Sequence, residues 1–197
     1  MNSTGTTLPK TKSPARETSW PSHSQATAAT DMAKRFEDVF EDAIASWQAT
    51  VPGGVAQRLG GKRLFVLIAN HEAPTLNRDA AAFWARNGLP TSFLTKWFAA
   101  SGLDKKKHMY SALHVNPSTL SRAKPETPLD AAVTERVLRQ SDLFLRAAEV
   151  FGSEGTTWMT KPHDLLDGKS PMEYAANEFG GAKVRQILNA IEYGGVV

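Results

Sequence analysis

The sequence predicts an all-α protein, and three features of the 197-residue chain support this fold class. Apolar residues recur at intervals of three and four in most segments, which is the spacing of one face of an α-helix. Residues that favour helix starts, followed by proline, precede several of these segments, and glycine often comes after them. No two alternating apolar segments flank a tight turn, so no β-hairpin is predicted.

The N-terminal part of the chain, residues 1–60, is predicted to be an extension of the main body. Residues 1–30 consist mostly of Ser, Thr, Pro, Ala and Gly, so they have too little apolar surface to offset the entropy cost of ordering. We therefore expect residues 1–30 to be disordered. Residues 31–48 are expected to form an amphipathic helix, whose apolar face consists of Met32, Phe36, Val39, Phe40, Ala43 and Trp47.

Residues 64–69 form a short apolar run that is compatible with either a strand or a buried helix. Periodicity does not distinguish the two, because the run is shorter than two helical turns. A helix is favoured because the surrounding segments are helical.

Several short helices are predicted in the middle of the chain. Three of them are expected at residues 77–86, 90–100 and 104–113. Gly88 and Gly102 follow the first two, at positions where glycine commonly ends a helix. A fourth helix should cover residues 116–123, because Asn116 is a favourable cap and Pro117 occupies the first helical position.

Two further helices are expected to begin at capping patterns. Residues 127–130, Thr-Pro-Leu-Asp, combine a cap, a first-turn proline and an acid, so a long helix should run from there to residue 151. Residues 170–173, Ser-Pro-Met-Glu, form a capping box. We expect Gly180 and Gly181 to interrupt the helix that starts there. Its apolar stripe continues with Val184, Ile187, Leu188 and Ile191.

The composition excludes several functional classes. Without cysteine, the chain has no disulfide, thiolate metal site or cysteine nucleophile. The five histidines lack metal-ligand spacing, and no phosphate-binding loop or nucleophile elbow occurs, so we predict a non-enzyme with no metal and no cofactor. No apolar run approaches the roughly 18 residues of a membrane span, and no secretory signal is visible, so a cytoplasmic protein without a membrane partner is expected.

Basic residues concentrate in the middle of the chain. Residues 61–128 carry 10 basic and 4 acidic side chains, whereas residues 129–197 carry 7 and 10. A basic segment of this kind is expected to face a polyanion. Residues 104–124 have the layout of a helix-turn-helix, with a tight turn through His114 and Val115 between a helix and a second, shorter one.

The second helix of this pattern has small polar and basic side chains, which suit contacts with bases and phosphates. Leu120 is expected to anchor this helix on the first one. An ordinary helical pair with a solvated basic face would have the same pattern, and the residues alone leave both interpretations open. The candidate DNA-binding residues are Lys105, Lys106, Asn116, Ser118, Thr119, Ser121, Arg122 and Lys124.

The end of the chain, residues 193–197, combines an aromatic side chain and two valines with two glycines. A solvated terminus needs no such apolar side chains. We therefore expect a slender tail that enters a cleft of a partner protein.

The C-terminal half carries a series of motifs in a fixed order. They are Leu-Phe-Leu-Arg-Ala-Ala-Glu-Val-Phe-Gly at 143–152, Trp-Met at 158–159, Gly-Lys-Ser-Pro-Met at 168–172, Ile-Leu at 187–188 and Ile-Glu-Tyr-Gly at 191–194. In order and spacing they resemble the Xre/MbcA/ParS toxin-binding domain of bacterial antitoxins, with Met159 in place of a leucine of similar volume. The resemblance extends over about residues 104–197.

The resemblance implies an Xre-like helix-turn-helix domain at residues 61–140 and a small helical toxin-binding domain at 141–197. It implies an antitoxin that blocks a RES-domain toxin, an enzyme that degrades NAD. It also implies binding to operator DNA, and hence to the nucleoid, to repress the operon. The implied toxin-binding residues are Arg185, Leu188, Ile191, Glu192, Tyr193, Gly194, Gly195, Val196 and Val197.

A homodimer or higher oligomer is expected, because one short recognition helix buries little surface and paired half-sites multiply the affinity for DNA. The alternative function is that of a stand-alone helix-turn-helix transcriptional regulator, in which the C-terminal domain only oligomerises.

Overall fold

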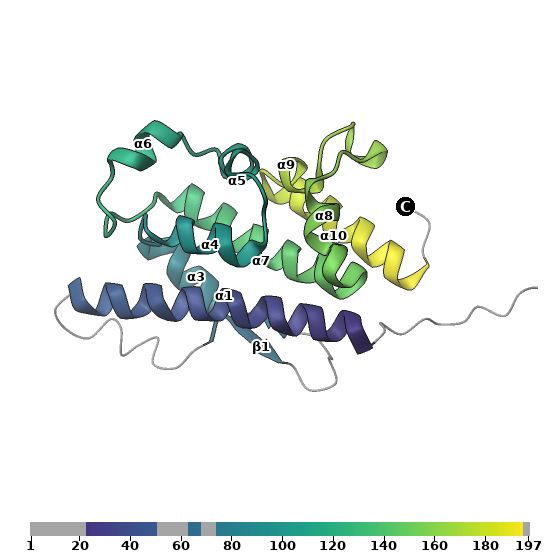
Figure 1. Cartoon of the computed structure of the whole chain (residues 1–197), viewed down its shortest axis with the longest axis horizontal. Helices are drawn as coiled ribbons and strands as arrows, with labels where there is room; N and C mark the ends of the chain where they lie inside the picture. The colour runs from purple at the N-terminus through teal and green to yellow at the C-terminus, as the bar shows by residue number, and fades with distance from the viewer. Residues whose placement is uncertain (1–22, 51–62, 68–73, 195–197) are drawn as a thin grey trace, which may run out of the picture.

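The computed structural model of the chain describes residues 23–50, 63–67 and 74–194, and these are mainly helical (Figure 1). The all-α prediction is confirmed, with a small hairpin as an addition. The α-helices are α1 (His23–Thr50), α3 (Arg78–Asn87), α4 (Phe93–Ser101), α5 (Lys106–Leu113), α6 (Pro117–Arg122), α7 (Ala131–Phe151), α8 (Gly155–Thr160), α9 (Pro171–Tyr174) and α10 (Glu178–Tyr193). The shorter elements are strands β1 (Phe65–Leu67) and β2 (Pro74–Leu76) and the 3-10 helices η1 (Gly152–Glu154) and η2 (Asp164–Leu166).

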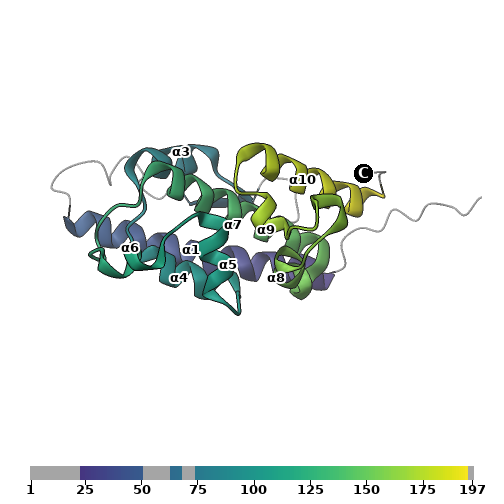
Figure 2. The same cartoon turned by 90° about the horizontal axis from the view of Figure 1, so that it is seen from above.

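Helix α7 is the centre of the fold, and α1, α3, α8 and α10 all pack against it. Figures 1 and 2 show α1 extended along the body, against α4 and α7. Trp97 of α4 joins these helices, because its ring lies 6.2 Å from that of Phe36 in α1 and 6.0 Å from that of Phe144 in α7. Its indole nitrogen donates a hydrogen bond of 2.8 Å to the hydroxyl of Ser141. One apolar core therefore includes α1, α4 and α7.

The N-terminal prediction is wrong for the described part of residues 1–30, because α1 begins at His23. Ala29 is fully buried, and the side-chain amide of Gln25 donates a hydrogen bond of 2.8 Å to the carbonyl of Val150 at the end of α7. Tertiary contacts with α7 thus stabilise a helical start that composition alone disfavours. Residues 1–22 lie outside the described part of the chain.

The predicted domain boundaries also differ from the structure. Helix α1 is part of the core rather than an extension, since Phe36 and Phe40 are buried against α4 and other elements. The expected boundary between residues 140 and 141 falls inside α7, which is continuous from Ala131 to Phe151. The two predicted domains therefore share one helix.

Strand β1 corrects the helix expected at residues 64–69. It pairs antiparallel with β2, with Phe65 opposite Leu76, so a hairpin that the sequence did not predict is present. The carboxylate of Glu37 in α1 accepts hydrogen bonds of 3.0 Å from the amides of Leu64 and Phe65. Burial raises the pKa of Glu37 despite these bonds. Backbone pairing with distant partners, rather than local periodicity, decides the conformation here.

Most predicted helix ends are confirmed by their hydrogen bonds. The side chains of Asn77 and Asn116 cap α3 and α6, and Ser170 with Glu173 forms the expected capping box of α9. Gly102 ends α4 with a φ of 71°, in the left-handed region. These interactions lie within one helical turn, which explains why the sequence predicts them.

The start of α7 differs from the expected one. Asp130 is the cap, and its carboxylate accepts a hydrogen bond of 2.7 Å from the amide of Val133. The carbonyl of Thr127 instead accepts hydrogen bonds from the amide and the hydroxyl of Thr91, at 2.8 and 2.6 Å. Because these contacts hold residues 127–128 beside the start of α4, α7 begins at Ala131.

The prediction that Gly180 and Gly181 interrupt a helix is wrong. Both glycines lie in the first turns of α10. The break between α9 and α10 is at residues 175–177. A Cβ atom at Gly180 would lie 1.9 Å from the carbonyl oxygen of Tyr174, and one at Gly181 would lie 2.6 Å from Cδ of Arg139. The glycines therefore allow close packing of α10 against α9 and α7.

Candidate functional site

Helices α5 and α6 lie where the sequence predicts two short helices joined by a turn. His114 ends α5 in the left-handed region with a φ of 52°, and the amide of Val115 donates a hydrogen bond of 3.0 Å to the carbonyl of Tyr110. The chain then turns into α6, which is capped by Asn116. Figure 1 shows α6 at one end of the molecule, connected to α5 by this turn.

The polar side chains of α6 are accessible to a ligand. No residue of α6 is buried, and Leu120 is half-buried and packs against the core. The side chain of Asn116 accepts a hydrogen bond of 2.8 Å from the amide of Ser118, so this candidate is already engaged as a cap. The other candidate DNA-binding side chains are exposed: Lys105, Lys106, Ser118, Thr119, Ser121, Arg122 and Lys124.

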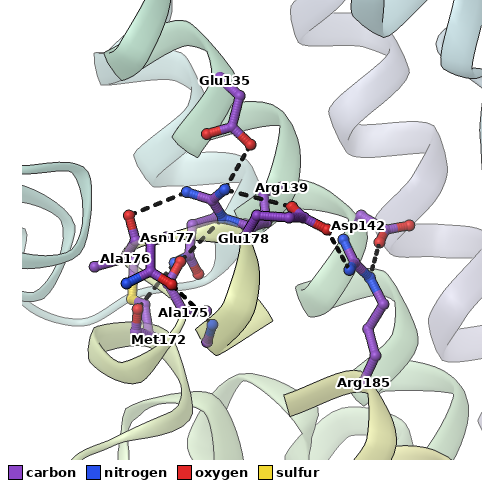
Figure 3. Close-up of polar contacts among 11 residues, drawn as sticks. Glu135, Arg139, Asp142, Met172, Ala175, Ala176, Asn177, Glu178 and Arg185 are labelled. Atoms are coloured by element: carbon purple, nitrogen blue, oxygen red, sulfur yellow. Dashed lines mark hydrogen bonds and ion pairs between the residues drawn. The ribbon is translucent and has the colours of Figure 1, made fainter. Parts of the chain in front are cut away.

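A row of ion pairs joins α7 to α10. Arg139, Asp142 and Arg146 of α7 pair with Glu178, Arg185 and Glu192 of α10, respectively, and we call these six residues the α7–α10 ion-pair network. Figure 3 shows the pairs of Arg139 and Arg185. The three α10 residues are seven positions apart, so they lie on one side of the helix.

Arg139 is the buried end of this network, with 4% of its side chain exposed. Its guanidinium donates hydrogen bonds of 3.0 and 3.1 Å to the carbonyls of Ala175 and Ala176, and it pairs with Glu135 at 2.6 Å (Figure 3). These carbonyls belong to the turn between α9 and α10. Arg139 therefore fixes the start of α10 on α7.

Arg146 lies at the other end of the network. It donates hydrogen bonds to Oδ1 of Asn189, at 2.9 and 3.2 Å, and pairs with Glu149 and Glu192. Burial lowers the pKa of Arg146, but the bonds to Glu192 and Glu149 outweigh burial and raise it. Burial raises the pKa of Glu149, although the hydrogen bond and the positive charge of Arg146 lower it. This cluster holds the last turn of α10 in place.

The predicted toxin-binding residues fall into accessible and inaccessible groups. The side chain of Tyr193 is 75% exposed and that of Ile191 is 43% exposed, while Gly194 caps α10 in the left-handed region. Leu188 is fully buried in the core, so its assignment as a partner contact is wrong. Its apolar side chain stabilises the packing of α10 instead.

Arg185 and Glu192 have internal partners. Arg185 is half-buried and pairs with Asp142 at 3.0 Å, and the Glu192 side chain is 12% exposed beside Arg146. Burial lowers the pKa of Arg185, but the hydrogen bonds and charge pairing of its guanidinium with carboxylates, chiefly Asp142, together have a larger effect, so the pKa is raised overall. Both residues therefore hold α10 on α7, and their charges are already paired within the chain. Gly195, Val196 and Val197 lie outside the described residues.

Sequence reasoning missed Phe179, which is 88% exposed on α10. The sequence indicates this exposure, because Phe179 lies off the apolar stripe of its helix, and only that stripe faces the protein core. The α7–α10 network was missed as well, although the seven-residue spacing of Glu178, Arg185 and Glu192 is visible in the sequence.

Within the described ranges, no helix has the length and apolarity that a membrane crossing requires. The same residues contain no group of three or more His, Asp or Glu side chains placed to hold a metal ion.

Comparison with known proteins matches the C-terminal part of the chain. Residues 146–194 fit the family model of the antitoxin Xre/MbcA/ParS C-terminal toxin-binding domain. A curated relative, "Antitoxin Xre" of Pseudomonas putida, is 29% identical over 76 residues, which are 38% of this chain and 48% of that protein. The chain thus matches about half the length of this relative, and no solved structure matches. The resemblance to the Xre/MbcA/ParS toxin-binding domain is confirmed for residues 146–194, the end of α7 through α10.

Proposed function

We propose that this chain is the antitoxin of a toxin–antitoxin pair and that it blocks a RES-domain toxin that degrades NAD. The observation that carries the proposal is that the matched toxin-binding domain, residues 146–194, ends in an exposed helix terminus with Tyr193. An exposed aromatic side chain at a helix end is well suited to enter a pocket of a partner protein.

The proposed mechanism is steric exclusion of NAD. Arg146 holds the last turn of α10 through Asn189 and Glu192, so the chain leaves α10 at Gly194 in a defined place. The tail that follows enters the NAD site of the toxin, and α10 contacts the rim of that site. The antitoxin itself performs no chemical step in this mechanism.

Cellular NAD is the measurement that tests this proposal. The protein encoded by the gene adjacent to the one for this chain is expressed alone and together with the chain, and NAD is quantified in both cultures. We expect NAD to fall in the first culture and to be preserved in the second. Equal NAD levels in the two cultures would contradict the proposal.

DNA binding is proposed as a second function, supported by the exposed polar and basic side chains of α5 and α6. A dimer or larger oligomer of the chain would place two α6 helices on an operator in the promoter of its own operon. The competing hypothesis is a stand-alone regulator without a toxin. An adjacent gene for a RES-domain protein favours the antitoxin, and the absence of such a gene favours the regulator.

Replacing Arg122 by alanine is expected to weaken operator binding by about 1–3 kcal/mol if its guanidinium contacts a base edge. Arg122 is exposed in the last turn of α6, so the substitution leaves the fold intact. Fluorescence anisotropy with a labelled promoter fragment measures the change. Arg86→Ala, which removes an exposed arginine from α3, is the matched control. If the two variants bind the promoter fragment with equal affinity, Arg122 is not part of the DNA-binding surface.

A further inference from the structure

We infer that the outer face of α10 is a second contact surface for the same protein toxin, with Phe179 as its anchor. This inference rests on the proposed function. It extends the toxin contact from the C-terminal tail to the opposite end of α10.

Phe179 is the first observation that supports this surface. Its side chain is 88% exposed, compared with 75% for Tyr193 and 48% for Leu165. Exposure of a phenylalanine ring to water is unfavourable compared with its burial, and the ring has no polar group that could form hydrogen bonds with water. Such a ring is a typical anchor of a protein interface when it lies on an accessible face.

Phe179 and Tyr193 lie on the same face of α10. With 3.6 residues per turn, these positions share one side of the helix and are about 21 Å apart along its axis. Ala182 and Gln186 are exposed between the two rings. We define the outer face of α10 by the residues that share this side: Phe179, Ala182, Lys183, Gln186, Ala190 and Tyr193.

The charges of α10 are directed away from this face. Glu178, Arg185 and Glu192 belong to the α7–α10 ion-pair network, so they point toward α7. Lys183 is the charged residue that remains on the outer face. The centre of a protein interface is depleted of charged residues and enriched in aromatic ones, and the outer face of α10 has this composition.

The ring of Phe179 is presented on a rigid support. Gly180 and Gly181 let the first turns of α10 approach Tyr174 and Arg139 so closely that a Cβ atom would clash at either position. Arg139 also binds the carbonyls just before the helix. Because the backbone next to Phe179 is fixed before binding, a partner has little conformational entropy to remove.

The toxin is the occupant that fits this face best. Phe179 lies inside residues 146–194, which match a toxin-binding domain, and its face continues to Tyr193 at the proposed toxin contact. Two aromatic anchors on one helix suit a single partner that covers α10 along its length. A second copy of this chain on the same face is the competing occupant.

The experiment compares Phe179→Ser with the unsubstituted chain. The probe is the purified protein encoded by the gene adjacent to the one for this chain, and its affinity is measured by calorimetry. We expect binding to weaken by about 10- to 100-fold, as for other aromatic anchors. Leu165→Ser is the matched control, because it removes an exposed apolar side chain from η2. It should bind the toxin as the unsubstituted chain does.

A second variant, Gln186→Arg, places a bulky charge between the two rings and should also weaken binding. The unfolding temperatures of all three variants are expected to be unchanged, since the replaced side chains are exposed. Unchanged toxin affinity of both outer-face variants would overturn this inference while the proposed function stands. A change in self-association alone would assign the face to a second copy and would overturn it too. If the unsubstituted chain does not bind the probe, the proposed function fails and this inference with it.

Discussion

A chain that ends at Glu192 is expected to fold as the full-length chain does and to lose toxin neutralisation. The truncation removes Tyr193, which is 75% exposed, Gly194 and the three residues after it, while Arg146 keeps its contacts with Asn189 and Glu192. Loss of an aromatic anchor and of the plugging tail should weaken toxin binding by about 30-fold or more, equivalent to about 2 kcal/mol. Growth and cellular NAD during co-expression with the toxin measure the effect.

A chain that ends at Gly194 separates the two contributions to this effect. It keeps the ring of Tyr193 and the left-handed cap of α10, and it lacks only residues 195–197. If this chain neutralises the toxin and the shorter one does not, Tyr193 is the critical contact. Neutralisation by both chains, at the level of the full-length protein, would rule out the plug mechanism.

Replacing Arg139 by methionine is expected to lower the free energy of unfolding by about 3 kcal/mol. The Arg139 side chain is 4% exposed and supplies the hydrogen bonds to the carbonyls of Ala175 and Ala176. Methionine fills a similar volume but leaves both carbonyls without this donor, and Glu178 loses a partner. Equilibrium denaturation in urea measures the difference.

Arg185→Met is the matched control for this substitution. Arg185 belongs to the same network, but its side chain is 34% exposed and its partners are carboxylates that water can solvate. We expect a loss of about 1 kcal/mol or less, as for exposed ion pairs. Equal losses for the two variants would show that burial of Arg139 is not the reason for its contribution.

Helix positions and many helix ends could be predicted because their causes are local. Asn116 and Ser170 cap helices by hydrogen bonds to amides two or three residues later, as expected, and Asn77 caps α3 in the same way. The apolar spacing of α1 and α7 likewise identifies their buried faces, including Phe36 and Phe144.

The candidate site could be predicted only in part. The motifs at the end of the chain identified the toxin-binding domain, and Tyr193 is accessible there as expected. The resemblance placed Leu188 on the same surface, but in the structure its side chain is fully buried in the core. Phe179 was missed, although its position off the apolar stripe of α10 is visible in the sequence.

The sequence by itself determined where most of the helices form and which motifs the C-terminal domain carries, because these properties depend on residues within one or two turns of each other. The tertiary structure decided the hairpin beside Glu37, the early start of α1 and the start of α7 at Ala131. It also decided the orientation of α10, through Arg139 and its partners. Each of these features depends on hydrogen bonds or packing between segments far apart in the chain, and the energy of such contacts exceeds the local preferences of the residues involved.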